Sequence, residues 1–64
     1  MKPGDLRRFL EGAFVRNDRH FNGKIFLVLS VEFNGVDILM DGEMYEGWAY
    51  SVLQYNSEPV DEAR

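Results

Sequence analysis

Few side chains of this sequence could carry out acid–base or nucleophilic chemistry. His20 is the only histidine, and Asp18 lies two residues before it, so that a metal pair or a general base can be imagined. A zinc site usually needs three or four protein ligands, and the chain has no cysteine to supply them. Ser30, Ser51 and Ser57 have no histidine at a spacing that suggests a nucleophile and its base. We interpret His20 as a solvated loop residue and predict no enzyme, no cofactor and no metal site.

Carboxylates gather in the second half of the chain, at Asp37, Asp41, Glu43 and Glu46. Alternate spacing along strands would place Asp37 and Glu46 on one outer face, where they could bind a hard cation or transfer a proton. The simpler interpretation, which we adopt, is a solvated outer face. Asp41 is explained by the turn that it forms with the following glycine.

Aromatic residues are the better indication of function. In the strand register set by the turns, Phe26, Met44 and Trp48 fall on the outer face of a sheet, and Tyr50 and Tyr55 lie beyond it. Exposed aromatic clusters mark binding surfaces. We therefore predict a protein-binding surface made of Phe26, Trp48, Tyr50 and Tyr55, with Trp48 as its anchor. The alternative is that the sheet curls until Trp48 joins a second small core, with the tyrosines at its rim.

The first third of the chain combines cations with phenylalanines at positions 9, 14 and 21, which is the composition of a nucleic-acid contact. The candidate residues for such a contact are Arg7, Arg8, Arg16, Arg19 and Lys24. Residues 1–24 have three more positive than negative charges, whereas residues 25–55 contain five carboxylates and no lysine or arginine. The formal net charge of −4 disfavours binding to a polyanion, so solvated loop charges are the competing interpretation. The same division of charge could also drive head-to-tail self-association.

Length and composition limit the fold. A chain of 64 residues with 45% hydrophobic and 14% aromatic residues predicts one domain with an aromatic-rich core and does not indicate disorder. The longest apolar run is Ile25–Leu29, whereas a helix that spans a bilayer needs about 20 apolar residues. The N-terminus does not resemble a signal peptide, and the absence of cysteine agrees with a reducing compartment, so we expect a cytoplasmic location.

Two turn signals predict a three-stranded antiparallel meander. Asn34-Gly35 and Asp41-Gly42 are pairs that favour type I′ hairpins, and strand-forming runs cover residues 24–33, 36–40 and 43–48. Residues 5–9 and 53–55 are further strand candidates, which together give five strands that can curl into a small barrel. Residues 9–24 are expected to form a long loop, residues 49–52 a short 3₁₀ turn before the last strand, and residues 56–64 a disordered acidic tail.

Two-residue turns also predict which face is buried. With Phe33 opposite Val36 and Ile38 opposite Tyr45, one face is almost wholly apolar and is predicted to be the core. That face consists of Leu27, Leu29, Val31, Phe33, Val36, Ile38, Met40 and Tyr45. The opposite, mixed face consists of Phe26, Val28, Ser30, Glu32, Asp37, Leu39, Met44, Glu46 and Trp48.

The order of these motifs resembles a known class of proteins. A Gly-Asp-Leu-x-Arg-Phe start at residues 4–9 leads through a loop to a long apolar strand, two tight turns, a strand bearing Trp48 and a final Ser-x-Leu at residues 51–53. This pattern is similar to the small SH3-like, KOW-like β-barrels of unknown function that tailed bacteriophages encode, although family members usually have an apolar residue at the position of Arg7. The resemblance covers residues 1–55. It implies an all-β, five-stranded SH3-like barrel and a viral setting, but no particular activity.

Three functions follow as expectations. The first is a non-enzymatic binding or accessory module, of phage origin and active in the host cytoplasm, that contacts a host or viral protein. The second is a nucleic-acid-binding module that uses the basic first third of the chain. The third is a small structural or assembly protein of the virion. No cofactor and no membrane partner are expected for any of them.

Overall fold

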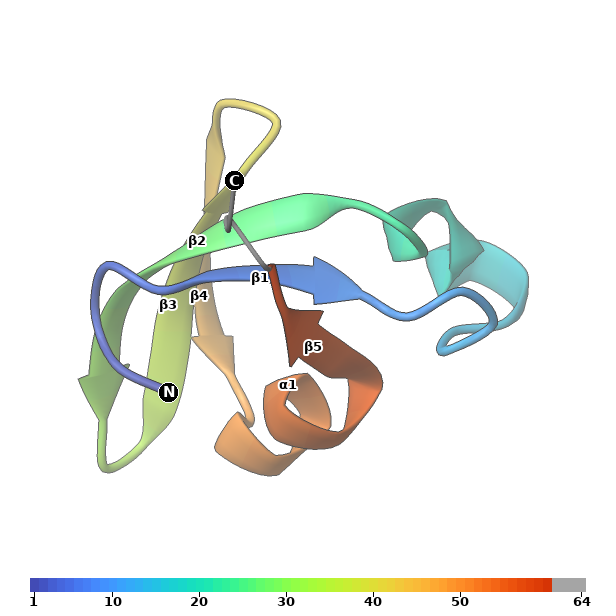
Figure 1. Cartoon of the computed structure of the whole chain (residues 1–64). Coiled ribbons are helices and arrows are strands. Elements are labelled where there is room, and N and C mark those ends of the chain that lie inside the picture. The colour runs from blue at the N-terminus through green and yellow to red at the C-terminus, as the bar shows by residue number, and fades with distance from the viewer. Residues whose placement is uncertain (61–64) are drawn as a thin grey trace.

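The computed structural model of the chain describes residues 1–60, which form one antiparallel sheet and two short helical segments (Figure 1). The five strands lie in the order β4-β3-β2-β1-β5, so that β4 and β5 are the two edges of an open, curved sheet. The closed barrel that was expected is therefore not observed, whereas the mostly β architecture with five strands is confirmed. The elements are β1 (Leu6–Phe9), η1 (Arg16–Phe21), β2 (Ile25–Glu32), β3 (Gly35–Met40), β4 (Glu43–Trp48), α1 (Tyr50–Asn56) and β5 (Ser57–Pro59).

The second hairpin forms as its sequence predicts. Met40 pairs with Glu43 and Ile38 with Tyr45, as the two-residue turn requires. Asp41 and Gly42 have φ angles of 55° and 78°, and a type I′ turn needs positive φ at both positions. The Asp-Gly signal therefore fixes both the position and the register of the β3–β4 connection.

The first hairpin differs from its prediction by the position of the turn. Glu32 pairs with Gly35, so the two turn residues are Phe33 and Asn34 rather than Asn34 and Gly35. The register shifts again between Val28 and Ser30, where β2 has a bulge. The predicted pairing of Phe33 with Val36 is therefore wrong, and Phe33 lies fully exposed at the tip of the turn.

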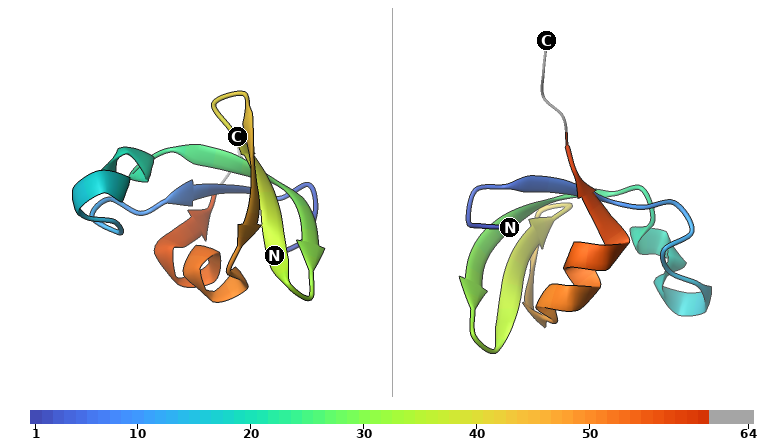
Figure 2. Two further views of the ribbon diagram at one scale, coloured as in Figure 1. Left: turned by 180° about the vertical axis from the view of Figure 1, so that it is seen from behind. Right: turned by 60° about the horizontal axis from the view of Figure 1, so that its bottom comes forward.

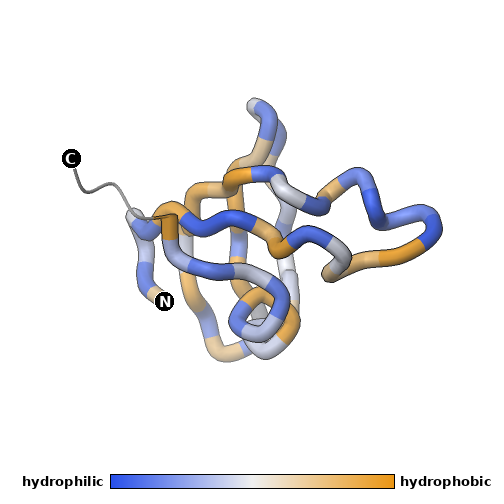
Figure 3. The backbone as a smooth tube through the Cα atoms, turned by 45° about the vertical axis from the view of Figure 1, so that its right-hand side comes forward, coloured by the Kyte–Doolittle hydropathy of each residue, from blue (hydrophilic) through white to orange (hydrophobic). Residues whose placement is uncertain are grey.

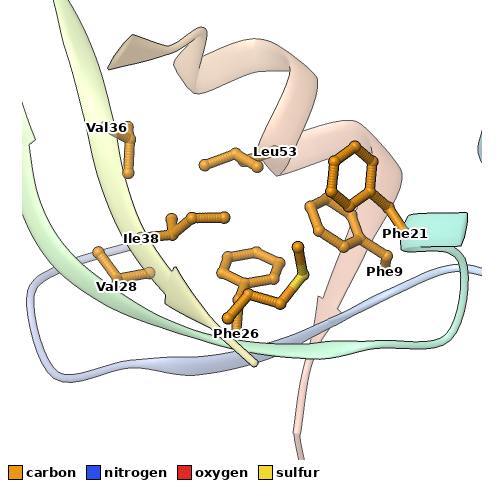
Figure 4. Packing of buried hydrophobic residues seen from close by; sticks show 8 residues of the cluster. Phe9, Phe21, Phe26, Val28, Val36, Ile38 and Leu53 are labelled. Carbon is orange, nitrogen blue, oxygen red and sulfur yellow. The ribbon is translucent and has the colours of Figure 1, made fainter. Parts of the chain in front are cut away.

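These shifts reverse the two faces of β2 before its bulge, whereas Val31, beyond the bulge, packs against the core as the sequence predicts. Phe26 and Val28, which the sequence places outside, are buried, and Leu29 and Phe33, which it places inside, are exposed. In β3 the predicted inner residues are buried as expected. The core, seen from close by in Figure 4, consists of Phe9, Phe21, Phe26, Val28, Val36, Ile38, Met40 and Leu53.

Two segments around the sheet also differ from expectation. The segment between β1 and β2 contains the 3₁₀ helix η1 and projects from the sheet, with hydrophilic residues at its tip (Figures 2 and 3). The predicted 3₁₀ turn and last strand at residues 49–55 are replaced by α1, which packs Leu53 into the core. Residues 57–59 form β5 along β1, so the prediction of a disordered tail is wrong for them, and residues 61–64 of that tail lie outside the described residues.

Gly35 allows β3 and β4 to approach closely. A Cβ atom at Gly35 would lie 2.8 Å from the Cα atom of Gly47, and the φ angle of Gly35 is 156°. We expect Gly35→Ala to lower the free energy of unfolding by about 3 kcal/mol, through left-handed backbone strain and overpacking together. Urea denaturation of the variant measures this loss.

Gly12 provides the matched control, because its φ angle is also positive, at 80°, and no atom lies within 4 Å of its ideal Cβ position. Gly12→Ala should cost only about 1 kcal/mol, from backbone strain alone. Equal losses in the two variants would contradict the close approach of β3 and β4.

Candidate binding surface

A row of apolar side chains crosses the outer face of the sheet. Met44 pairs with Leu39, Leu39 with Leu27, and Leu27 with Leu6, so these four residues lie side by side on β4, β3, β2 and β1. They alternate with the buried or partly buried residues of their strands and therefore point away from the core. The N–H group of Val60 bonds to the carbonyl of Leu6 at 3.0 Å and extends the row to the chain beyond β5.

This row is open to solvent. Met44 is 57% exposed, Leu6 and Leu39 are each exposed by more than a third, and Ile25 and Leu29 beside them are exposed as well. We call this surface the outer apolar face and define it as Leu6, Ile25, Leu27, Leu29, Leu39 and Met44. Contiguous exposed apolar patches are uncommon on monomeric proteins and mark interaction sites.

The sequence analysis missed this surface, although the sequence contains a signal for it. An antiparallel strand with one solvated face alternates apolar and polar residues. The five consecutive apolar residues Ile25–Leu29 break that alternation and imply an apolar side chain on both faces of β2. The prediction of a single apolar face overlooked this consequence.

A shallow acidic pocket of about 310 Å³ lies at one end of the same face. It is lined by Glu32, Asn34, Gly35, Asp37, Glu46 and Gly47, which come from the end of β2, the β2–β3 turn, the first residues of β3 and the end of β4. The prediction that Asp37 and Glu46 share a surface is confirmed, because both line this pocket. The two glycines have no side chains to fill the space between the acidic residues.

Asp37 is held in place by two hydrogen bonds. The Ser30 hydroxyl donates to Asp37 Oδ2 at 3.1 Å, and the Gly47 N–H group donates to Asp37 Oδ1 at 3.1 Å. The second bond fastens the bulge of β4 to β3, next to the paired residues Val36 and Trp48. Asp37 therefore has a structural role in addition to contributing charge to the pocket.

Hydrogen bonds shift the pKa of two residues near the β3–β4 turn. The Tyr45 hydroxyl donates to Glu43 Oε1 at 3.0 Å, which raises the pKa of Tyr45 above its ordinary value of 10.0. Lys24 Nζ lies 2.8 Å from Asp41 Oδ2, and this contact raises the pKa of Lys24 above 10.5. Both shifts hold the proton more firmly, so neither side chain becomes a general base near neutral pH.

The predicted aromatic surface is not assembled. Phe26 is 1% exposed and its ring lies 4.6 Å from that of Phe9, so its assignment to a binding surface is wrong. The shifted register of β2 is the cause. Trp48 is half-buried, with its ring 5.5 Å from Phe21 and 6.0 Å from Phe14, which agrees with the alternative in which it joins a core.

The two tyrosines of the predicted surface lie on α1. Both are exposed, Tyr55 to 79%, and the Tyr50 hydroxyl accepts a hydrogen bond of 2.9 Å from the amino group of Met1. Residues five positions apart on an α-helix point about 140° apart around its axis. Tyr50 and Tyr55 therefore do not form one surface with each other.

The candidate nucleic-acid residues are also dispersed. Arg7 is 7% exposed, and its guanidinium donates to the hydroxyl and carbonyl oxygens of Ser57, so it is not available to a phosphate. Arg8 lies on the outer face opposite Glu58, and Lys24 is paired with Asp41. The remaining two, Arg16 and Arg19, lie on η1 and share it with Asp18. The five cations do not line one groove.

The surroundings of His20 agree with its interpretation as a solvated residue without a chemical role. Its Nδ1 atom lies 2.9 Å from the carbonyl oxygen of Asn17, and its ring contacts that of Phe21 at a centroid distance of 4.2 Å and a tilt of 39°. Residues 1–60 contain no group of three or more histidine or carboxylate side chains arranged to hold a metal ion. In the same part of the chain, no helix has the length and apolar character needed to cross a bilayer.

Within residues 1–60, the outer apolar face with the acidic pocket at its end is thus the contiguous surface best suited to recognition. Comparison with protein-family models, with curated proteins and with solved structures found no match to this chain.

Proposed function

We propose that this chain is a small, non-enzymatic binding module that contacts another protein through its outer apolar face. The observation that carries the proposal is the exposure of the apolar row on the outside of a sheet whose inner face already has a complete core. Removal of apolar surface from water contributes about 25 cal/mol per Å². A partner that covers this face therefore gains binding free energy from the apolar area that it buries.

We also propose that the open sheet belongs to the SH3-like class that the sequence resembles. Four features support this assignment: five short antiparallel strands, a long connection between β1 and β2, tight connections on both sides of β3, and a single short helix before the last strand. The edge strands β4 and β5 lie on opposite sides of this sheet, so its barrel remains open.

The biological setting follows from the resemblance alone. A phage origin and a host or viral protein as partner stay predictions, as does a location in the cytoplasm. The alternative of a virion assembly protein would use the same outer apolar face, with a neighbouring subunit as its partner. The nucleic-acid alternative has lost Arg7 from its set of contacts.

A capture experiment tests the proposal. The full chain and a Leu39→Ser/Met44→Ser variant are immobilised, and proteins retained from a cell lysate are quantified. We expect at least a tenfold loss of retained partner with the variant, because a loss of about 1.4 kcal/mol already corresponds to tenfold in affinity.

Tyr55→Ser is the matched control, because Tyr55 is more exposed than either residue and lies on α1, away from the sheet face. It should retain the partner as the unchanged chain does. Circular dichroism and urea denaturation verify that all three proteins are folded. Equal retention by the double variant and the unchanged chain would refute the proposed role of the outer apolar face.

A further inference from the structure

The two edges of the sheet are unequally protected. Edge strands have backbone N–H and C=O groups that no neighbouring strand satisfies, and proteins usually protect them with short length or proline. β5 has three residues and ends in Pro59. β4 has six residues without proline, its protective bulge lies beyond Tyr45, and within residues 1–60 its only strand partner is β3.

The free edge of β4 adjoins the outer apolar face. Met44 points outward at the end of the apolar row, and Glu46, which lies at the bulge of β4, lines the acidic pocket on the same face. A strand added to this edge would lie about 4.8 Å from β4 and would extend the row by one more side chain. The first position on the added strand therefore favours an apolar residue beside Met44.

The second position favours a cation. Glu46 lines the acidic pocket together with Glu32 and Asp37, and residues 25–55 contain no lysine or arginine to neutralise them. Opposite charges on directly opposed cross-strand residues are stabilising, and like charges are destabilising. A lysine or arginine beside Glu46 also has the length to reach over the pocket.

We propose that β4 binds an extended segment of a partner protein that carries an apolar residue and, two positions from it, a lysine or arginine. The inference rests on the proposed binding function and adds the chemistry of the partner. The added strand gains main-chain hydrogen bonds from the free edge, and its alternate side chains provide the specificity. A second copy of this chain is disfavoured, because β4 carries Glu43 and Glu46 and no cation, so pairing of β4 with β4 would join two negatively charged edges.

A selection from a displayed library of random ten-residue peptides tests this proposal on the full chain. We expect the enriched peptides to share an apolar residue and a lysine or arginine spaced by two. Glu46→Lys should reverse the preference at the second position to aspartate or glutamate. Glu58→Lys, an exposed charge reversal on the outer face of β5 at the opposite edge, should leave the preference unchanged.

The best enriched peptide is then synthesised for fluorescence polarisation. N-methylation of alternate backbone amides should weaken its binding at least tenfold in one of the two alternation frames, since only that frame removes hydrogen bonds to β4. Enriched peptides that lack the cation but require Leu39 and Met44 would overturn the inference and leave the proposed function intact. Absence of any enriched peptide, or equal effects of both N-methylated frames, would also overturn strand addition, while the capture experiment decides the proposed function separately.

Discussion

Phe26→Ala is expected to lower the free energy of unfolding by about 3–5 kcal/mol, the usual cost of deleting a buried phenylalanine ring. Phe26 is 1% exposed and lies at the centre of the core, with its ring 4.6 Å from Phe9. Domains have about 0.05–0.15 kcal/mol of stability per residue, which gives a 64-residue chain about 3–10 kcal/mol in total. The variant should therefore lose about a third or more of this stability, and it unfolds at 25 °C if the total lies at the lower end of that range. Urea denaturation followed by circular dichroism measures the loss.

Phe33→Ala is the matched control, because it deletes the same ring from a fully exposed position at the tip of the β2–β3 turn. Its effect should stay within about 0.5 kcal/mol, as for most surface substitutions. The two variants also distinguish the two registers of β2, since the pattern of the sequence alone places Phe33 inside and Phe26 outside. A large loss from Phe33→Ala with a small loss from Phe26→Ala would contradict the observed register.

The sequence could predict the strands but not the orientation of β2. The Asp41-Gly42 signal predicts the second turn correctly, because both residues adopt the positive φ that a type I′ turn requires. The Asn34-Gly35 signal misleads because Gly35 is needed instead for the close contact with Gly47. Ile25–Leu29 is apolar on both faces, so a register slip that would normally bury charges carries no such penalty in this part of β2.

The helix α1 was not predicted from the sequence, for a different reason. It is seven residues long, and no side chain caps its N-terminus, so local signals for a helix are weak. Helices this short are stabilised by tertiary packing rather than by propensity. Leu53, which is fully buried against the core, provides that packing. From the sequence alone, Leu53 is equally consistent with a strand.

The candidate site was likewise predicted only in part from the sequence. The acidic residues Asp37 and Glu46 were placed on a common surface correctly, although β4 has a bulge beside Asp37 that the sequence pattern did not predict. The apolar row could not be located without the register that joins Leu6 of β1 to Met44 of β4. Long-range pairing of β1 with β2 and of β1 with β5 decides which side chains meet, and turn signals alone do not specify it.

Arg7 is a cation at a buried position of β1, and its environment explains how it is accommodated there. Its Nε atom donates to Ser57 Oγ at 2.8 Å and its Nη2 atom donates to the Ser57 carbonyl at 3.0 Å. The Ser57 hydroxyl in turn donates to the carbonyl of Leu53 on α1. No carboxylate among residues 1–60 forms an ion pair with Arg7, so these neutral oxygens stabilise the buried charge.

Ser57→Ala should therefore lower the free energy of unfolding by about 2–3 kcal/mol, because it removes a hydrogen bond to a buried charged group. Arg7→Met fills the same space without a charge and should change stability by less than about 1 kcal/mol, since replacing a buried ion by an apolar side chain is often neutral. In the Arg7→Met background, Ser57→Ala should cost only about 0.5–1 kcal/mol, as for an ordinary neutral hydrogen bond. Urea denaturation of the four proteins gives the coupling energy of the pair, which we expect to be about 1–2.5 kcal/mol.

Ser30→Ala is the matched control. It tests whether the cost of removing any hydrogen-bonded serine hydroxyl depends on the residue at position 7. Ser30 donates to Asp37 at 3.1 Å in a half-buried position and has no contact with Arg7. Its loss should be the same, within about 0.5 kcal/mol, with arginine or methionine at position 7, because distant sites act additively. If Ser57→Ala also cost the same in both backgrounds, the guanidinium would gain nothing from the Ser57 hydroxyl. The attachment of β1 to the end of α1 would then depend on backbone pairing between β1 and β5 and on the packing of Leu53.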